Sequence, residues 1–140
     1  MYRIDESAWP VVVFEFAGVQ SLADHEGSLQ RWNALFAREA DFVALRVFHD
    51  EDALVHPEGV GRVTKQWLRD GAADAIRRHV AAMMNVVLPP AAYERMKHMS
   101  VEAAFGVPGG VFDSVEAAAA WFQSRFGKPL SLPQDHAASA

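Results

Sequence analysis

One segment of the sequence concentrates the side chains that could do chemistry. It reads HDEDALVHPEG, residues 49–59, and it contains two histidines and four carboxylates. Imidazole and carboxylate groups bind zinc and transfer protons, so His49 and His56 are candidates for a metal or acid–base site. A calcium loop beginning at Asp50 fits badly, because Val55 stands at the sixth position, where the sharp turn needs glycine. We favour a solvated acidic loop, and a partner- or ligand-binding rim and a metal site stay open as alternatives.

The other catalytic motifs in the chain are incomplete. The HE pair at 25–26 begins a zinc-protease motif, but Leu29 stands where the second histidine belongs. The GVG at 59–61 begins a dinucleotide-binding motif, but Thr64 replaces its third glycine. No GxSxG nucleophile motif occurs. We therefore expect no enzyme, no cofactor and no metal, although residues far apart in the sequence could still converge in three dimensions.

Two further groups of residues are candidates for binding. Arg62, Lys65 and Arg69 share one predicted helix face, which is either a solvated surface or a contact for an anion. Trp67 on the same polar helix is a candidate for a partly exposed contact. The candidate ligand- or partner-binding residues are therefore His49, Asp50, Asp52, His56, Arg62 and Trp67, and no residue is assigned a catalytic or metal-binding role.

Four methionines gather in the second half of the chain. They are Met83, Met84, Met96 and Met99, and apolar residues surround them in the sequence. Methionine adapts to irregular shapes, so such a group forms an ordinary core, an apolar ligand cavity or a dimer surface. We favour the core and keep the cavity and the dimer surface as alternatives.

Composition and charge narrow the class of protein. The chain has 140 residues, 13 basic and 18 acidic, and its net charge of −5 disfavours binding to nucleic acid. It has no cysteine, which excludes disulfides and thiolate zinc sites and fits a reducing compartment. The start lacks the pattern of a signal peptide, and no segment approaches the roughly 20 apolar residues of a membrane helix. We expect a cytoplasmic protein without an integral membrane segment.

Hydrophobic periodicity predicts the elements that position these residues. We expect strands at 2–7, 11–18, 41–48 and 79–88, a short edge strand within 107–112, and helices at 21–39, 62–70, 91–105 and 115–126. Ser21 with Asp24 is expected to cap the first helix, and Asp113 or Ser114 the last, where Glu116 would complete a capping box with Asp113. The order β-β-α-β-α-β-α-β-α predicts an α/β fold, with a single mixed, mostly parallel sheet and helices packed on it. Residues 1–127 form one domain in this prediction, and 128–140 form a flexible C-terminal tail.

With that order, the chain resembles the SpoIIAA-like family of small bacterial STAS/Sec14-type domains. The residues that carry the resemblance are PVVVFEFAG, FVALRVFHD and, above all, VFDSVEAAAAWF, and it extends over about residues 2–126. It implies a STAS-like fold and a non-enzymatic module that binds a partner protein or a second copy of itself as a homodimer. Anti-sigma antagonist members carry a phosphorylatable serine after the third strand. Here His49 and Asp50 occupy that place, so a serine switch is not implied.

The function expected from the sequence is therefore a regulatory protein-binding module. The alternative is a small apolar-ligand or lipid-binding protein, which the methionines and the Sec14-like relatives of the family suggest. A third possibility is an enzyme or metal protein that uses the acidic loop at 49–58.

Overall fold

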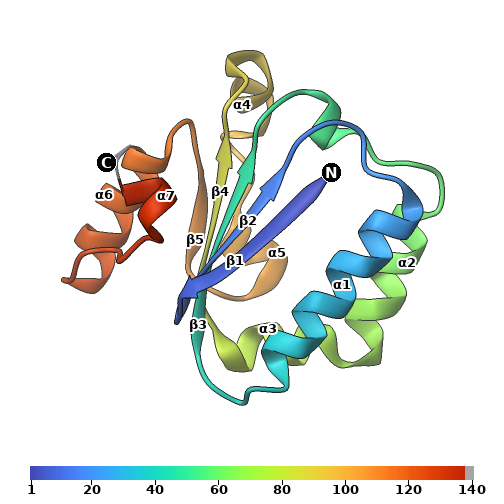
Figure 1. The fold of residues 1–140 in the computed structure, drawn as a ribbon, viewed down its shortest axis with the longest axis horizontal. Coiled ribbons are helices and arrows are strands. Elements are labelled where there is room, and N and C mark those ends of the chain that lie inside the picture. The colour runs from blue at the N-terminus through green and yellow to red at the C-terminus, as the bar shows by residue number, and fades with distance from the viewer. Residues whose placement is uncertain (138–140) are drawn as a thin grey trace.

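A computed structural model of the chain describes residues 1–137. It is an α/β protein with one five-stranded mixed sheet, in which the strands lie in their order along the chain (Figure 1). The strands are β1 (Tyr2–Ala8), β2 (Val11–Phe16), β3 (Phe42–Phe48), β4 (Val80–Val87) and β5 (Gly109–Phe112). β1 pairs antiparallel with β2, and the other three pairs are parallel. The predicted α/β class and the single mixed sheet are confirmed.

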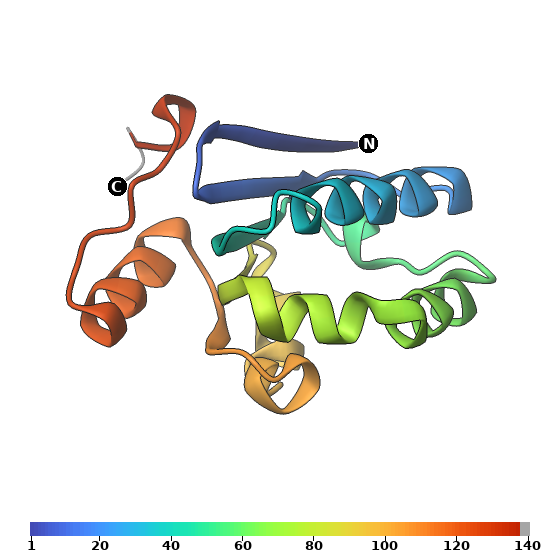
Figure 2. The same ribbon diagram turned by 90° about the horizontal axis from the view of Figure 1, so that it is seen from below.

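Helices cover both faces of this sheet. They are α1 (Leu22–Phe36), α2 (Val60–Trp67), α3 (Ala73–His79), α4 (Pro90–Met96), α5 (Val101–Phe105), α6 (Val115–Phe126) and α7 (Gln134–Ala137). A 3-10 turn, η1 (Asp52–Leu54), precedes α2, and a π turn, η2 (Leu68–Ala72), joins α2 to α3. The helices α1, α2, α3 and α5 lie on one side of the sheet, and α6 lies on the other (Figures 1 and 2).

The alternation of side chains along the strands gives the protein two cores. On β2, Val12 and Phe14 point towards α1 and α3, while Val11 and Val13 point towards α6. Phe14 is fully buried and stacks on Trp32 of α1, with ring centroids 4.5 Å apart. Because helices cover both faces, the central strands are apolar along nearly their whole length, which is the pattern that made them recognisable in the sequence.

One of the predicted helices is divided in two, and the caps of two others can be compared with the sequence prediction. The helix predicted at 91–105 is two helices, because the chain leaves helical geometry after Met96 and Ser100 caps α5 by accepting a hydrogen bond from the backbone N–H of Ala103. The last helix is capped by Ser114, which accepts from the N–H of Ala117. Of the two predicted caps Ser114 is therefore confirmed, and the predicted capping box between Asp113 and Glu116 is wrong. The capping box of Ser21 and Asp24 at the start of α1 is confirmed.

The helix predicted at 62–70 does not stop at Gly71. Instead the chain continues through η2 into α3, and Gly71 adopts a φ of +131° at the kink. A side chain is strained in that region of φ, so glycine permits a change of helix direction without an intervening loop. The result is one bent helical segment between β3 and β4.

The segment predicted to be a flexible tail contains a short helix. Within its described part, 128–137, α7 forms, and Leu130 and Leu132 pack against the core on the α6 side of the sheet. His136 is buried there. Residues 138–140 lie outside the described part of the chain.

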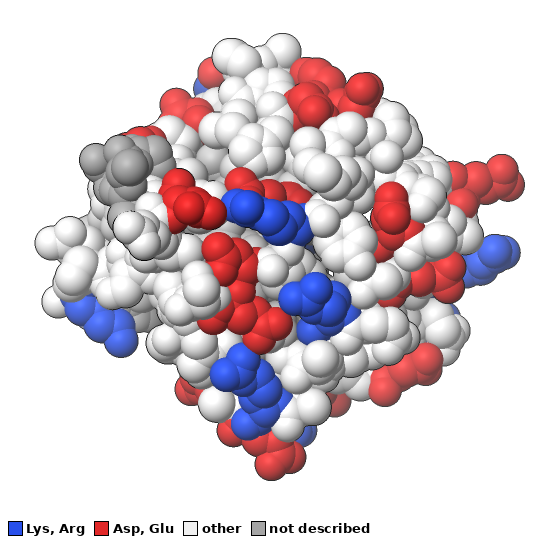
Figure 3. All heavy atoms as spheres, in the orientation of Figure 1, with Lys and Arg blue, Asp and Glu red and all other residues white. Residues whose placement is uncertain are grey.

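Helix length and surface charge bear on what the described protein can contact. Among residues 1–137, no helix is long and apolar enough to cross a membrane. On the face shown in Figure 3, acidic and basic side chains are interspersed. A partner that meets this face would therefore contact charges of both signs.

Candidate functional site

A cavity of about 360 Å³ lies between the sheet and the helices α1, α2 and α5. Its floor is the end of β3 with Met83 of β4, and the loop that follows β3 forms one side. Apolar side chains make up most of its wall, among them Trp32, Phe48, Met83, Met96 and Phe105. Its volume lies within the range of about 300–1,000 Å³ that is typical of small-molecule sites.

The topology of the sheet explains where the cavity forms. The parallel strands β2 and β3 both end there, and Phe16 and Phe48 at their ends stack with ring centroids 5.1 Å apart. In α/β proteins ligands bind at the carboxyl ends of the strands, where the connections to the following helices diverge. Two of the apolar residues that line the cavity are also exposed, Val55 at 50% and Met99 at 42%.

A charged residue, Arg46 of β3, lines this otherwise apolar cavity. Arg46 is in register with Asn85 on β4, and its Nε–H donates a hydrogen bond of 2.8 Å to the Asn85 Oδ1. Asn85 is only 1% exposed. Burial away from water lowers the pKa of Arg46 to about 10, so the guanidinium is still charged at neutral pH.

Two uncharged polar groups share the same wall. His25 Nε2 lies 2.7 Å from the Thr64 hydroxyl oxygen, and that hydroxyl donates its hydrogen to the backbone carbonyl of Val60. The hydroxyl must therefore accept from His25, which places the proton on Nε2 and leaves Nδ1 as an acceptor. Burial lowers the pKa of His25, which favours its neutral form. Gln20 also lines the cavity, and its Oε1 is buried without a hydrogen-bond partner among the described residues.

Of the six candidate binding residues predicted from the sequence, His56 and Trp67 line the cavity. Trp67 is fixed by a hydrogen bond from its Nε1 to the Asn33 Oδ1, at 2.8 Å. It also borders a more open hollow between α1 and α2, which has a volume of about 590 Å³. Trp67 therefore separates two hollows on the same side of the sheet.

The other four predicted residues do not line the cavity. Asp50 has a structural role, because its carboxylate accepts hydrogen bonds from the backbone N–H groups of Gly18 and Ala53 and so joins the loops after β2 and β3. Asp52 is exposed in η1, and Arg62 is exposed on α2. His49 contributes to a separate polar cluster on the opposite face.

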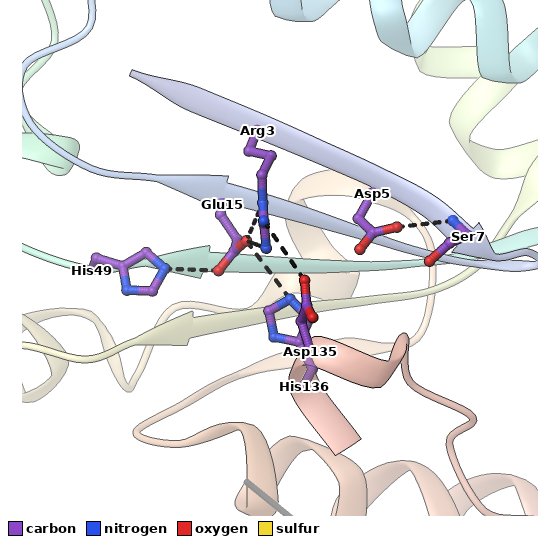
Figure 4. Close-up of polar contacts among 7 residues, drawn as sticks. All are labelled: Arg3, Asp5, Ser7, Glu15, His49, Asp135 and His136. Atoms are coloured by element: carbon purple, nitrogen blue, oxygen red, sulfur yellow. Dashed lines mark hydrogen bonds and ion pairs between the residues drawn. The ribbon is translucent and has the colours of Figure 1, made fainter. Parts of the chain in front are cut away.

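That polar cluster surrounds Glu15 of β2 (Figure 4). Glu15 accepts a hydrogen bond of 2.8 Å from Arg3 Nε and lies 3.0 Å from His49 Nε2 and 3.6 Å from His136 Nε2. Burial by itself raises the pKa of Glu15, but the hydrogen bonds to His49 and Arg3 and the nearby His136 outweigh it, so its pKa lies below the ordinary value. Within residues 1–137, no three His, Cys, Asp or Glu side chains are placed to hold a metal ion.

Arg46, Asn85 and Gln20 were not among the residues predicted from the sequence. A signal for the first two was present, because Arg46 interrupts the apolar strand FVALRVF and Asn85 interrupts VAAMMNVV. A polar residue inside a strand that is buried on both faces needs a partner, and that requirement makes it informative. Sequence spacing could not show that the two residues are neighbours on adjacent strands.

Comparisons with protein families, with curated proteins and with solved structures gave no match to this chain.

Proposed function

We propose that this protein binds a small, largely apolar molecule in the cavity between the sheet and α1, α2 and α5. The observation that carries the proposal is the cavity itself, which combines apolar walls with a few polar groups. Such a combination is typical of ligand sites, in which the apolar surface supplies affinity and the polar groups fix orientation. The methionines support the proposal, since Met83, Met96 and Met99 all line the cavity.

Native mass spectrometry of the freshly purified protein tests this proposal. We expect a retained mass of a few hundred daltons or less, and we expect Ala53→Phe to lose it. Ala53 is 7% exposed and lines the cavity, and its backbone N–H would keep its bond to Asp50. The matched control is Ala120→Phe on α6, where the side chain is exposed on the other side of the sheet.

A saturable change in tryptophan fluorescence on titration with 1-octanol provides a second readout, because Trp32 and Trp67 line the cavity. A wild-type protein with neither a retained mass nor a saturable response would contradict the proposal. A response that Ala53→Phe leaves unchanged would place the binding elsewhere.

A protein-binding module that associates with a partner or with itself is our second proposal. The open hollow between α1 and α2 supports it, because Phe36 and Trp67 lie among polar residues there. Aromatic residues ringed by polar ones are common in protein interfaces. Sedimentation velocity over a range of protein concentrations tests self-association. A single monomer species at every concentration would contradict the homodimer.

A further inference from the structure

The Arg46 side chain has unused hydrogen-bonding capacity in an apolar setting. A guanidinium carries five N–H donors, and the one on Nε is taken by Asn85. The terminal nitrogens donate to no residue among 1–137, and their neighbours are rings: the guanidinium carbon lies 5.6 Å from the Phe48 centroid and 5.9 Å from that of Phe105. Ring faces attract a cation but do not accept hydrogen bonds as oxygen does.

The charge of Arg46 is also not balanced. No carboxylate in the described part of the chain lies within 4.0 Å of its guanidinium, whereas Arg3, Arg31 and Arg38 each form an ion pair. Arg46 is half-buried, and the apolar wall of the cavity leaves its charge only partly solvated, which is costly. Pairing with a ligand of opposite charge would offset that cost. The Nε–H bond to Asn85 holds the guanidinium in one orientation, which leaves its terminal edge available to a bidentate acceptor.

We propose that the cavity selects ligands that carry one carboxylate, which pairs with the terminal nitrogens of Arg46, and an apolar body that contacts the surrounding walls. This inference rests on the proposed function, and it names the ligand class of the same site.

A single negative charge fits the site better than a double one. Arg46 is the only Lys or Arg in the described wall of the cavity. Of the two histidines there, burial lowers the pKa of His25, which favours its neutral form. A phosphate monoester carries about −1.5 to −2 charges at neutral pH and would be undercompensated by one arginine. A carboxylate is matched by one guanidinium in both charge and fork geometry.

The volume limits the size of the apolar body. A cavity of about 360 Å³ corresponds to about twelve water volumes, at roughly 30 Å³ each. Octanoate, with about ten non-hydrogen atoms, is therefore a suitable probe. Its neutral analogue 1-octanol has the same chain with no charge, so the pair isolates the effect of the head group.

The experiment titrates the full-length protein with octanoate and with 1-octanol, using tryptophan fluorescence and calorimetry. We expect the wild type to bind octanoate at least tenfold more tightly than 1-octanol. Arg46→Met should abolish that preference and leave the affinity for 1-octanol within about twofold. Arg78→Met on α3 is the matched control, because Arg78 is exposed and does not line the cavity. It should keep the wild-type preference.

Each other outcome argues against a definite part of the proposal. Equal affinity of the wild type for both probes, or an unchanged preference in Arg46→Met, would overturn the carboxylate assignment and leave apolar binding intact. No binding of either probe would overturn the proposed function as well. If octyl phosphate binds more tightly than octanoate, the site prefers a dianion, and the assignment to a carboxylate is wrong. If Arg46→Met does not fold, Arg46→Lys keeps the charge without the fork, and it should retain only part of the preference.

Discussion

Two charged residues lie inside the central strands β2 and β3, and they have opposite surroundings. Glu15 points to the α6 side of the sheet and is paired with Arg3 and His49. Arg46 points to the other side, into the apolar cavity, and its single hydrogen bond among the described residues goes to the neutral Asn85. A paired charge is explained by the fold, whereas an unpaired one suggests a role in binding.

The stability of the ligand-free protein should reveal the cost of Arg46. Replacing Arg46 and Asn85 together, as Arg46→Met with Asn85→Leu, removes a half-buried charge and its buried partner, so neither is left without the other. We expect the free energy of unfolding, measured by urea denaturation, to rise by about 1–3 kcal/mol. A double variant that is less stable than the wild type would show that the pair stabilises the fold. Arg46→Met alone leaves Asn85 Oδ1 without its donor and should gain less.

The cluster around Glu15 should make stability depend on pH in the acid range. Its pKa is lowered on folding from an ordinary value of 4.5. The ionised carboxylate therefore stabilises the fold above that value, and the contribution is lost as the pH falls through the folded pKa. We expect Glu15→Gln to cost on the order of 1 kcal/mol at pH 7. The difference from the wild type should shrink as the pH falls below 4.5.

Urea denaturation between pH 3 and pH 7 measures this difference. Glu58→Gln serves as the control, because Glu58 is an exposed carboxylate in the loop before α2. A Glu15→Gln variant whose difference from the wild type is constant across this range would contradict the assignment.

At the scale of elements, the bent helical segment from α2 to α3 matters most, because it forms one wall of the cavity. Its bend depends on Gly71, whereas Gly61 lies in the first turn of α2. An added Cβ would meet nothing within 4 Å at either position, so only the backbone distinguishes them. Gly71 has a φ of +131°, and Gly61 does not lie in that region.

These two glycines give a matched pair of alanine substitutions. Gly71→Ala should lower the free energy of unfolding by about 1–3 kcal/mol, because alanine is strained at that φ. Gly61→Ala should raise it by about 0.5 kcal/mol, because alanine favours helix. Thermal and urea denaturation of both variants measure the effect. Equal and small changes in the two would show that the bend relaxes without strain.

At the scale of the whole molecule, the C-terminal segment closes the α6 side of the sheet. Leu130 and Leu132 pack against that core, and His136 is buried near Glu15 of β2 (Figure 4). The segment therefore joins the last part of the chain to its first two strands. Removing the segment should therefore lower the free energy of unfolding of the whole protein rather than unfold one helix.

Truncation after Gly127 tests that role. We expect a loss of about 2–3 kcal/mol in the free energy of unfolding, from the apolar area that Leu130 and Leu132 bury. The double variant Leu130→Ala with Leu132→Ala in the full chain should reproduce most of the loss. A truncated protein as stable as the full chain would instead support the flexible tail that the sequence predicts for 128–140.

Local patterns in the sequence were sufficient to predict the central strands and the start of α1. The runs VVVFEF and FVALRVF identified buried strands, and Ser21 with Asp24 identified the start of α1. These features depend on residues within one or two turns of each other, so the sequence contains all of the information they need. Where the sequence offered competing local signals, as for Asp113 and Ser114, it did not decide between them, and the structure has Ser114 as the cap.

The polar residues of the acidic loop at 49–58 are adjacent in the sequence, which made them candidates for a binding site. In the structure they do not form one site. The structure separates them: His49 joins Glu15 on one face, Asp50 fixes the loop, and His56 lines the cavity on the other side. The cavity combines Gln20 and Arg46, which is hydrogen-bonded to Asn85, with helices from both halves of the chain. Sequence determined the strands and the start of α1, because these depend on short-range periodicity and capping, but it did not show the division of the helix predicted at 91–105 or the formation of α7. Tertiary structure alone decided the site, because only the parallel register of β3 and β4 makes Arg46 and Asn85 neighbours.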